Sequence, residues 1–550
     1  MNTLRKAVSG IMAAALLAGC GASSIAAAPS SAASTEAAAS SAPAEAGASD
    51  GILNIGATDT LGTLNPLNMD WTYINFYSMS MEFLPLIALD SSYNQVGMLA
   101  EPITSDDNIT FNIKLKDDAV WSDGEPVTTD DVIWTILAMT SPEVANPNFD
   151  FSTIKGISDD NLSPEGAAEL EGLVKVDDKN MQIVMKSQMG LNTFLNNVGT
   201  WILILPKHVL QDVPADELLT SEWFSKPTVV SGPYMVTDYD PAHYISFDAN
   251  ENYFMGAPKI KKMNINIEDG AALVAGLQSG EIDFVNPAMS NIPTEDLDTI
   301  ENLDTIDVQW ADPVTNEMTY FNTTKVTDAR VRKAIVMALD RETIMQGVLA
   351  GHGEVTDGFV GKSSPYYDSS KENIPYDPEG AKALLEEAGW DGSRTIEYYV
   401  SSSDTSVIKA AQIMKQELAE VGVTININPV DFATLMSIGG SDEVDMFSVQ
   451  YTITPSDYYA DEASLVSGGA WTGGYQDDTV DELLAGTQTT TDPAELTSLY
   501  LQIDQKMEED VPLFSLYFMS NPGIVSKKLK NAVPSLFGAF NNIQDWEFAE

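Results

Sequence analysis

Apolar and polar residues alternate in several short segments of the chain, and patterns of helical period follow these segments. The first segment is ILNIGAT, residues 52–58, and the alternation returns between residues 110 and 115. Alternation of this kind is typical of β-strands. A turn follows at residues 122–124, and Thr129 is then predicted to cap a helix. Strand and helix patterns alternate to the end of the chain without an internal repeat, so we predict an α/β fold.

The chain after residue 322 shows the same pattern in a more compact form. Its first helix has apolar side chains on one face, at Val331, Ala334, Ile335 and Ala338. A second helix, from Pro378 to Ala388, is expected to end at Gly389, because glycine is common just past the last helical residue. The remaining pattern is strand, helix and strand, at residues 393–399, 407–420 and 423–428. We therefore expect a separate α/β lobe in this half.

The first twenty residues have a different pattern. Basic residues precede an apolar run from Val8 to Ala18, which is too short to cross a bilayer. This order predicts a signal peptide over residues 1–20. The sequence LAGC at residues 17–20 resembles the lipobox of bacterial lipoproteins, in which the cysteine is acylated. We predict lipid attachment at Cys20, and the alternative is a solitary buried cysteine.

Residues 21–50 consist mostly of alanine and serine, with almost no aromatic or branched side chains. Such a segment cannot bury enough surface to fold, so we predict a flexible tether. No later stretch is apolar for long enough to cross a membrane. The body after Asp50 is therefore expected outside the cytoplasm, held at the cell membrane only by its lipid.

Composition limits the partners and the means of stabilisation. The chain of 550 residues has 81 acidic and 28 basic residues, which gives a formal net charge of −53. Nucleic acid is an unfavourable partner, because its binding requires basic patches that release counterions. Since no cysteine follows Cys20, the body has no internal disulfide and depends on core packing.

Several stretches of sequence together resemble a known family. They are LAEPITSDDNITFNIKLKDDAVWSDGEPVTTDDV at 99–132, SGPYMV at 231–236, NENYFMGAP at 250–258, LQSGEIDF at 277–284, NTTKVTDARVRKAIVMALDRETI at 322–344 and YDPEGAKALLEEAGW at 376–390. In this order and spacing they resemble the family 5 extracellular solute-binding proteins of ABC importers. That family contains oligopeptide-, dipeptide- and nickel-binding receptors, and the resemblance covers nearly the whole chain after residue 50.

The resemblance implies a two-lobed periplasmic-binding-protein-like fold, class II and cluster C type, with an additional small domain. The ligand is expected between the lobes, near a hinge where the chain crosses more than once. The expected ranges are 51–83, 174–320 and 511–550 for a discontinuous lobe one, 84–173 for the small domain, and 321–510 for lobe two.

The resemblance also implies a site for the amino group of a peptide. Peptide-binding relatives place an aspartate in a loop of lobe two, within a motif like Trp-x-x-Asp-Tyr. The nearest stretch in this chain is 445–465, so the role falls on Asp457, which precedes Tyr458. Tyr451 stands in place of the tryptophan, at a longer spacing. The alternative is that Asp457 is an ordinary solvated acid of a loop.

The matching positions lack a partner for the carboxylate of a peptide. Some relatives that bind short peptides use an arginine just before this motif, or one after the strand that follows the Gly-Trp helix. The corresponding residues of this chain are Ser448 and the serines at 401–403. Because arginine is the natural bidentate partner of a carboxylate, this argues against a strict dipeptide or tripeptide receptor. Longer peptides or an uncharged ligand remain.

An aromatic cluster near the end of the first strand supplies further candidates, at Trp71, Tyr73, Phe76 and Tyr77. Aromatic residues at such a place suggest the wall of a pocket. We expect Trp71 and Tyr73, together with Tyr451, to accept varied side chains or sugar rings, and the alternative for each is core packing. Asn286, just after the strand of SGEIDF, is a candidate side-chain amide for the ligand.

The sequence contains no constellation typical of an enzyme, and we expect neither a cofactor nor a metal. His208, His243 and His352 lie far apart in dissimilar contexts, so nickel capture is a minor alternative. Acid pairs such as Asp130-Asp131 are explained as helix caps and solvated faces.

The predicted function is that of a monomeric receptor which captures a peptide, in particular an oligopeptide, and delivers it to the permease subunits of an ABC importer. Two alternatives stay open at this point. One is a receptor for an oligosaccharide or another non-peptide solute, and the other is a surface peptide sensor.

Overall fold

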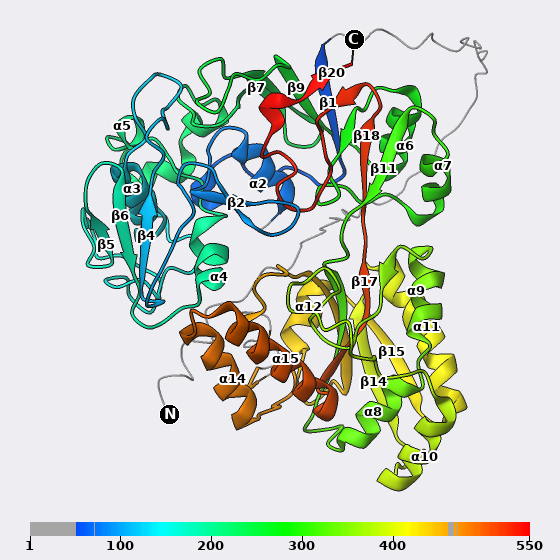
Figure 1. Ribbon diagram of the computed structural model, residues 1–550. Coiled ribbons are helices and arrows are strands. Elements are labelled where there is room, and N and C mark those ends of the chain that lie inside the picture. The colour runs from blue at the N-terminus through cyan, green and yellow to red at the C-terminus, as the bar shows by residue number, and fades with distance from the viewer. Residues whose placement is uncertain (1–50, 71, 460–461, 463–466, 470, 550) are drawn as a thin grey trace, which may run out of the picture.

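Two lobes form the described part of the chain, which comprises residues 51–549 except 71, 460–461, 463–466 and 470. Figure 1 shows the computed structural model, with one lobe above the other and strands that join them on one side. Cys20, the expected signal peptide and tether, and Trp71 lie outside the described residues. The two-lobed α/β arrangement confirms the predicted fold class. No described helix is both long enough and apolar enough to span a bilayer.

A mixed sheet of seven strands forms the centre of the upper lobe, in the order β11-β18-β10-β1-β9-β8-β7. β1 pairs in parallel with β10 on one side and β9 on the other, so that Ile55 lies opposite Phe284 and Ile265. The bounds are Ile52–Ala57 for β1, Tyr234–Asp240 for β7, Tyr244–Ala249 for β8, Lys262–Ile267 for β9, Phe284–Val285 for β10, Ile306–Trp310 for β11 and Pro522–Ser526 for β18.

Both faces of this sheet are covered. On one face, Val285 shares an apolar cluster with residues of α6, Gly270–Ser279, and α7, Leu297–Glu301. On the other face, the ring of Phe284 lies 5.7 Å from that of Phe540, near the C-terminus. Phe540 in turn lies 5.1 Å from Tyr77 of α2, Tyr73–Ser80. Sheet residues therefore hold α2 and the C-terminal segment together.

Short elements complete the upper lobe. The strands are β2 at Ile87–Leu89, β3 at Gln95–Gly97, β19 at Leu529–Lys530 and β20 at Glu547–Phe548. The helices are α4 at Leu191–Phe194 and α5 at Lys207–Leu210, with a π-helical turn, η2, at Leu195–Gly199. Turns of 3-10 helix lie at Pro66–Asn68, Ala215–Thr220, Glu222–Ser225, Thr294–Asp296 and Ile543–Asp545.

The lower lobe has a six-stranded sheet in the order β13-β17-β12-β16-β14-β15. Its bounds are Thr315–Phe321 for β12, Gly353–Glu354 for β13, Thr395–Ser401 for β14, Thr424–Val430 for β15, Met446–Thr452 for β16 and Leu513–Met519 for β17. Every residue of β12 is buried, as expected for a central strand with both faces covered.

Helices cover the two faces of the lower sheet, as Figure 1 shows. One face carries α8, α9, α10 and α11, at Ala329–Met337, Arg341–Leu349, Pro378–Ala388 and Thr405–Glu420. The other carries α12, α14 and α15, at Phe432–Ile438, Asp478–Thr489 and Pro493–Asp510. The lobe is thus a three-layer α/β/α unit.

A third, small sheet lies at the outer side of the upper lobe, in the order β4-β6-β5. Its bounds are Thr110–Lys114 for β4, Leu173–Lys175 for β5 and Asn180–Val184 for β6, and α3, Thr129–Met139, lies beside it. In the turn between β5 and β6, Lys179 Nζ donates to three backbone carbonyl oxygens, those of Lys116, Ala119 and Val127.

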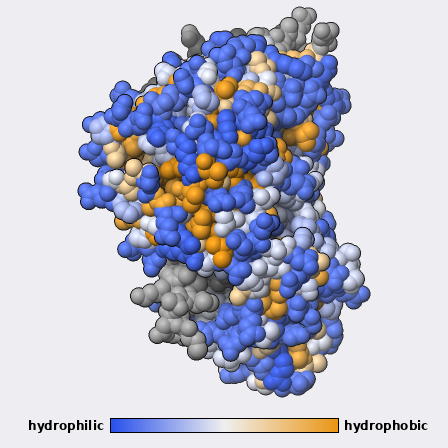
Figure 2. Space-filling model, turned by 60° about the vertical axis from the view of Figure 1, so that its left-hand side comes forward, coloured by the Kyte–Doolittle hydropathy of each residue, from blue (hydrophilic) through white to orange (hydrophobic). Residues whose placement is uncertain are grey.

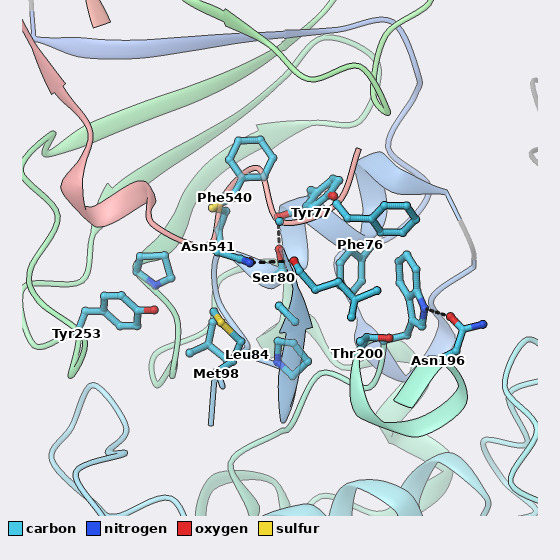
Figure 3. A pocket seen from close by; sticks show the side chains of 18 residues that line it. Phe76, Tyr77, Ser80, Leu84, Met98, Asn196, Thr200, Tyr253, Phe540 and Asn541 are labelled. Atoms are coloured by element: carbon cyan, nitrogen blue, oxygen red, sulfur yellow. Dashed lines mark hydrogen bonds between the residues drawn. The ribbon is translucent and has the colours of Figure 1, made fainter. Parts of the chain in front are cut away.

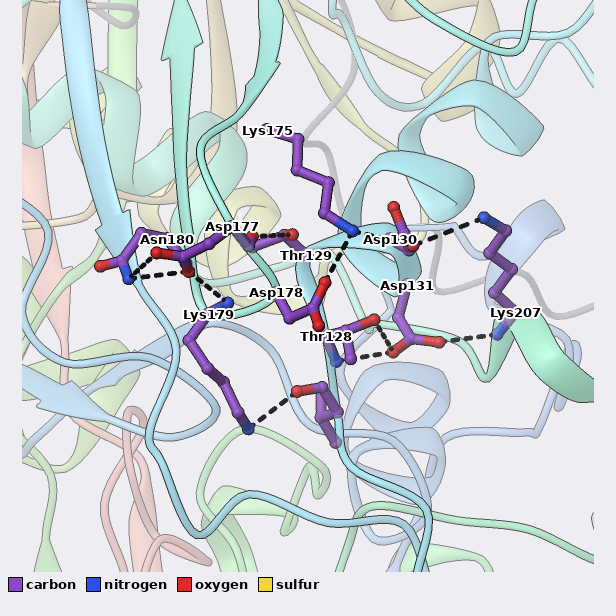
Figure 4. Close-up of polar contacts among 11 residues, drawn as sticks. Thr128, Thr129, Asp130, Asp131, Lys175, Asp177, Asp178, Lys179, Asn180 and Lys207 are labelled. Atoms are coloured by element: carbon purple, nitrogen blue, oxygen red, sulfur yellow. Dashed lines mark hydrogen bonds and ion pairs between the residues drawn. The ribbon is translucent and has the colours of Figure 1, made fainter.

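Figure 4 shows how this unit is fastened to the rest of the lobe. Asp131 accepts hydrogen bonds from the amide of Thr128, at 2.8 Å, and from the amide of Lys207 in α5, at 2.9 Å. Lys175 of β5 pairs with Asp130 at 3.1 Å. The acid pair therefore caps α3 and ties it to α5 and β5, which confirms its expected structural role.

The chain crosses between the lobes twice at the side shown in Figure 1, from β11 to β12 at residues 311–314 and from β17 to β18 at 520–521. The two crossings lie side by side, because the amide of Ala311 donates to the carbonyl of Asn521 over 3.0 Å. We call these two segments the hinge.

Sheet membership changes the expected domain boundaries. β5 and β6 pair with β4, so the small sheet continues beyond residue 173. β12 and β17 belong to the lower sheet, although residues up to 320 and from 511 were expected in lobe one. The physical reason is that alternation identifies a strand but not the sheet that the strand joins.

Several local predictions are confirmed. β1, β4, α10 and α11 fall where the pattern placed them. Gly389 ends α10 with a φ of 69°, in the left-handed region that glycine adopts without a steric cost. The cap of α3 was wrong by one residue: Thr128 is the N-cap and forms a capping box with Asp131, and Thr129 is the first helical residue.

Candidate functional site

The upper and lower lobes touch in a second place, away from the hinge. There α4 and η2 of the upper lobe meet the loop that follows β16 in the lower lobe. Asn192 Nδ2 donates to the carbonyl of Ser456 over 2.7 Å, and Thr193 Oγ1 donates to Asp457 Oδ1 over 3.0 Å. The loop predicted to hold a ligand's amino group therefore lies between the lobes.

Asp457 is almost completely buried at this contact, with 2% of its surface exposed. Its Oδ1 also accepts a weak hydrogen bond from the amide of Tyr459, at 3.4 Å. Its Oδ2 makes no hydrogen bond with the described residues. Burial raises the pKa of this carboxyl to about 6. Because it is buried, Asp457 is not the solvated acid of the alternative. An ammonium group of a ligand would both neutralise the carboxylate and satisfy its second oxygen.

Tyr458 is buried beside Asp457 but faces the interior of the lower lobe. Its ring centroid lies 6.1 Å from that of Tyr366 and 5.8 Å from that of Tyr500. Tyr366 also holds the loop, because its hydroxyl donates to the carbonyl of Ser456 over 3.1 Å. These tyrosines therefore support the loop from within the lobe.

Two predicted ligand contacts on β16 lie in the interior of the lower lobe. The hydroxyl of Ser448 is 2.6 Å from those of Thr319 and Tyr398, in the interior of the lower lobe. The hydroxyl of Tyr451 pairs with that of Tyr320 at 2.8 Å, and both rings belong to the core. The physical reason is that β16 is an inner strand, so helices cover its side chains on both faces.

Asn286 is a third predicted ligand contact that lies inside a lobe. It is fully buried in the upper lobe, where its Oδ1 accepts from the amide of Ala288 over 2.7 Å and its Nδ2 donates to the carbonyl of Ser535 over 3.3 Å. Both ends of the amide are therefore used to hold the turn after β10 against the C-terminal segment.

Tyr73, in contrast, lies where the lobes meet. It is buried, and its ring centroid is 6.1 Å from that of Trp201. Burial raises the pKa of its hydroxyl to about 12, and the side chain of Thr452 in the lower lobe opposes this rise. Of the predicted site residues, the structure thus brings Tyr73 and Asp457 to the contact between the lobes, and leaves Asn286, Ser448, Tyr451 and Tyr458 inside their lobes.

A pocket with aromatic walls lies in the upper lobe, and Figure 3 shows it from close by. Phe76 and Tyr77 of α2 line it, so these two members of the aromatic cluster form a pocket wall as expected, whereas Tyr73 is not among its lining residues. The other aromatic side chains of the wall are Trp201, Tyr253, Phe537 and Phe540, and Met98 also lines it. We call this the apolar pocket.

A second, smaller pocket lies between the lobes. Its wall includes Tyr93, Gln95 and Asn192 of the upper lobe, and Thr454 and Ser456 of the lower lobe. Three residues line both pockets: Leu89, Asn196 and Thr200. The two pockets are therefore neighbours, and the smaller one reaches Ser456, beside Asp457.

Sequence reasoning missed two segments of this site, residues 192–201 and 536–541. The first has no recognisable motif, and its π-helical turn has no distinct sequence pattern. The second reaches α2 only through the tertiary fold, where Tyr77 Oη donates to the carbonyl of Leu536, 459 residues further along the chain. No local signal could have placed either segment at the site.

The three histidines lie in separate places. His208 is 3.0 Å from Asp123 and His243 is 3.1 Å from Asp240, both in the upper lobe, and His352 stacks on Trp310. Among the residues that the structure describes, no three or more His, Cys, Asp or Glu side chains gather in a way that could hold a metal ion.

Comparison with known proteins agrees with this architecture. The oligopeptide-binding protein AppA of Bacillus subtilis is 26% identical over 490 residues, which are 84% of this chain and 86% of AppA. A putative ABC transporter peptide-binding protein of Brucella abortus is 28% identical over 502 residues, which are 86% of this chain and 88% of that protein.

Solved structures share the fold. The ABC transporter substrate-binding protein CtaP of Listeria monocytogenes superposes with a TM-score of 0.76 at 23% identity, over 90% of this chain and 99% of CtaP. AppA of Bacillus subtilis, solved in complex with a nonapeptide, gives a TM-score of 0.68 at 23% identity, over 90% of this chain and 99% of AppA.

The family model for the bacterial extracellular solute-binding proteins, family 5 middle region, matches residues 94–473, which is more than half of the chain. This protein therefore belongs to the family 5 extracellular solute-binding proteins, which are substrate-binding receptors of ABC transporters and not enzymes.

Proposed function

We propose that the protein captures an oligopeptide between its two lobes and delivers it to the permease subunits of an ABC importer. The observation that carries the peptide assignment is Asp457, a buried carboxylate between the lobes whose Oδ2 makes no hydrogen bond with the described residues. The amino terminus of a peptide is an ammonium group that fits this oxygen. The names of the relatives from Bacillus and Brucella, which are peptide-binding proteins, support the same ligand class.

The arginines support a peptide longer than two or three residues. After residue 50 they are Arg330, Arg332, Arg341 and Arg394, all in the lower lobe. Arg330, Arg341 and Arg394 pair with Asp328, Asp357 and Asp445, and Arg332 donates to backbone carbonyls. Each of these arginines is thus already engaged within the protein, and none provides a bidentate clamp for the terminal carboxylate of a peptide. The carboxyl end of the ligand therefore need not fix the length of the peptide.

Delivery to the importer follows from the two-lobed form. A ligand that contacts both lobes favours the closed arrangement. The permease would distinguish the loaded receptor from the empty one by this closed shape. We further propose a signal peptide at 1–20, lipid attachment at Cys20, a tether at 21–50 and a monomeric body with a small third domain. The sequence LAGC and the alanine- and serine-rich composition support the anchor.

Two experiments test the proposal. Isothermal titration with a pool of random nonapeptides is expected to show saturable binding near one peptide per chain. Mass spectrometry of small molecules that copurify with the folded protein is expected to show peptides. Copurified oligosaccharides, together with no heat from any peptide pool, would establish the non-peptide alternative instead.

A further inference from the structure

The walls of the apolar pocket are held in place by contacts among themselves. The ring of Phe76 lies 4.6 Å from that of Trp201 and 5.5 Å from that of Tyr77. Tyr77 in turn packs edge-on against Phe540, and its hydroxyl donates a hydrogen bond to the carbonyl of Leu536. Because each ring is fixed by its neighbours, the pocket is preformed and a ligand group would enter it at little cost in ordering.

Polar groups of the wall are already used by the protein. Ser80 Oγ donates to the carbonyl of Tyr77 over 2.9 Å, and Asn541 Nδ2 donates to the carbonyl of Leu89 over 3.0 Å. The indole Nε1 of Trp201 donates to Asn196 Oδ1 over 3.4 Å. The dashed lines of Figure 3 mark such bonds. The wall therefore offers a ligand mainly apolar surface.

None of the described residues that line the apolar pocket has a charged side chain. That absence is notable in a chain with 81 acidic residues. A charged or strongly polar group would lose its hydration there without gaining a partner. Figure 2 shows apolar side chains gathered on one face of the upper lobe, within an otherwise hydrophilic surface.

The position of the pocket connects it to the ligand site. Leu89, Asn196 and Thr200 separate it from the smaller pocket between the lobes, which reaches Ser456 beside Asp457. Asn196 also accepts a hydrogen bond from Thr454 of the lower lobe, at 3.4 Å. A peptide held by its amino end at Asp457 would therefore lie beside the residues that the two pockets share.

We infer that the apolar pocket determines specificity, and that it selects peptides with one large apolar side chain, aromatic or long aliphatic, near the amino end. This inference rests on the proposed peptide function and adds a ligand class to it. Burial of such a side chain is expected to tighten binding about 10- to 100-fold over a polar side chain of similar size.

Positional-scanning nonapeptide pools test this inference. Each pool has phenylalanine at one position and random residues elsewhere, and its matched pool has glutamine at that position. Competition against a fluorescent nonapeptide is expected to show an advantage of phenylalanine over glutamine of about tenfold or more at one position near the amino end. If both pools compete equally at every position, the inference about the apolar pocket is overturned, while the proposed peptide function stands. If no pool competes or binds, the proposed peptide function fails, and the inference fails with it.

A variant that fills the pocket gives an independent test. Ala88 is half-buried on β2 and lines the pocket, so Ala88→Phe should reduce the advantage of phenylalanine over glutamine to about one. Ala242→Phe is the matched control, because Ala242 lies on the exposed turn between β7 and β8, and it should retain the full advantage. Thermal unfolding verifies that each variant folds. If Ala88→Phe does not fold, Ser80→Leu narrows the same pocket from α2. A folded filled-pocket variant with an undiminished advantage would rule out this role.

Discussion

The hydroxyl of Thr193 in the upper lobe donates a 3.0 Å hydrogen bond to Oδ1 of Asp457 in the lower lobe. Neighbouring contacts strengthen this junction: the amide of Gly190 donates to Gln488 Oε1 over 2.9 Å, and Asn108 Nδ2 donates to the carbonyl of Thr490 over 2.8 Å. One oxygen of Asp457 thus helps to hold the lobes together, while the other makes no hydrogen bond with the described residues. Under the proposed function, this one carboxylate would take part both in closure of the lobes and in capture of an amino group.

Replacement of Asp457 by asparagine should weaken the binding of peptides with a free amino terminus about 10- to 100-fold, because a charged hydrogen bond of about 1.5–3 kcal/mol is lost. Titration calorimetry with one nonapeptide measures the change. The same peptide with an acetylated amino terminus should bind Asp457→Asn and the unaltered protein with similar affinity.

Asp442→Asn is the matched control for this variant. Asp442 is an exposed acid of the same lobe, so its loss changes the net charge by the same amount without touching the contact between the lobes. Its peptide affinity should stay within about twofold of that of the unaltered protein. Equal losses in both variants would mean that general charge, and not the site, governs affinity.

Peptide affinity should fall at acidic pH. Burial raises the pKa of Asp457 to about 6, so this carboxyl is mostly ionised at pH 7.5 and mostly neutral at pH 5. Since an ammonium group binds the ionised form, affinity for a free-amine peptide should be about tenfold lower at pH 5. Calorimetry at the two pH values measures the change. An affinity that is independent of pH would contradict the assigned role of Asp457.

Glu82 should make the upper lobe less stable as the pH rises. It is fully buried, accepts a hydrogen bond from the amide of Val236 at 2.8 Å, and burial raises its pKa to about 8. The unfolded chain releases this proton near pH 4.5, whereas the folded protein retains it until about pH 8. Stability attributable to Glu82 therefore declines between these values, by about 1.4 kcal/mol per pH unit.

Glu82→Gln removes this titration and keeps an acceptor for Val236. Urea unfolding at pH 5, 6 and 7 should show the free energy of unfolding of the variant rising relative to the unaltered protein at each step. Comparison of the two proteins cancels other titrating groups. A constant difference across this range would show that Glu82 is ionised in the folded state.

The buried ion pair between Arg341 and Asp357 should matter far more than an exposed pair. Both side chains are 4% exposed or less, and Arg341 also donates to the carbonyls of Thr356 and Ser515 at 2.9 Å. Arg341→Met leaves a buried carboxylate without its partner, so the free energy of unfolding should fall by about 3–5 kcal/mol.

Arg330→Met is its matched control. Arg330 pairs with Asp328 at 2.7 Å, but its side chain is 45% exposed, so the loss should be under about 1 kcal/mol. Chemical denaturation measures both variants. Similar losses in the two would show that burial does not set the contribution of these ion pairs to stability.

Local pattern was enough for the order of elements and for the family. The alternation in β1 and β4, the stop of α10 at Gly389 and the segments resembling family 5 all depend on neighbouring residues. For the same reason the sequence pointed to the aromatic wall at Phe76 and Tyr77, and to the loop of Asp457.

The surroundings of each side chain were decided only by the tertiary structure. Ser448 and Tyr451 lie near Asp457 in the sequence, but they belong to β16, an inner strand of the lower sheet, and their side chains are buried in the core. Segment 536–541 contacts α2 although it lies near the other end of the chain, and Thr193 contacts Asp457 although 264 positions separate them in the sequence. Periodicity reports on contacts within a helix or strand, whereas a binding site forms from contacts between elements that only packing brings together.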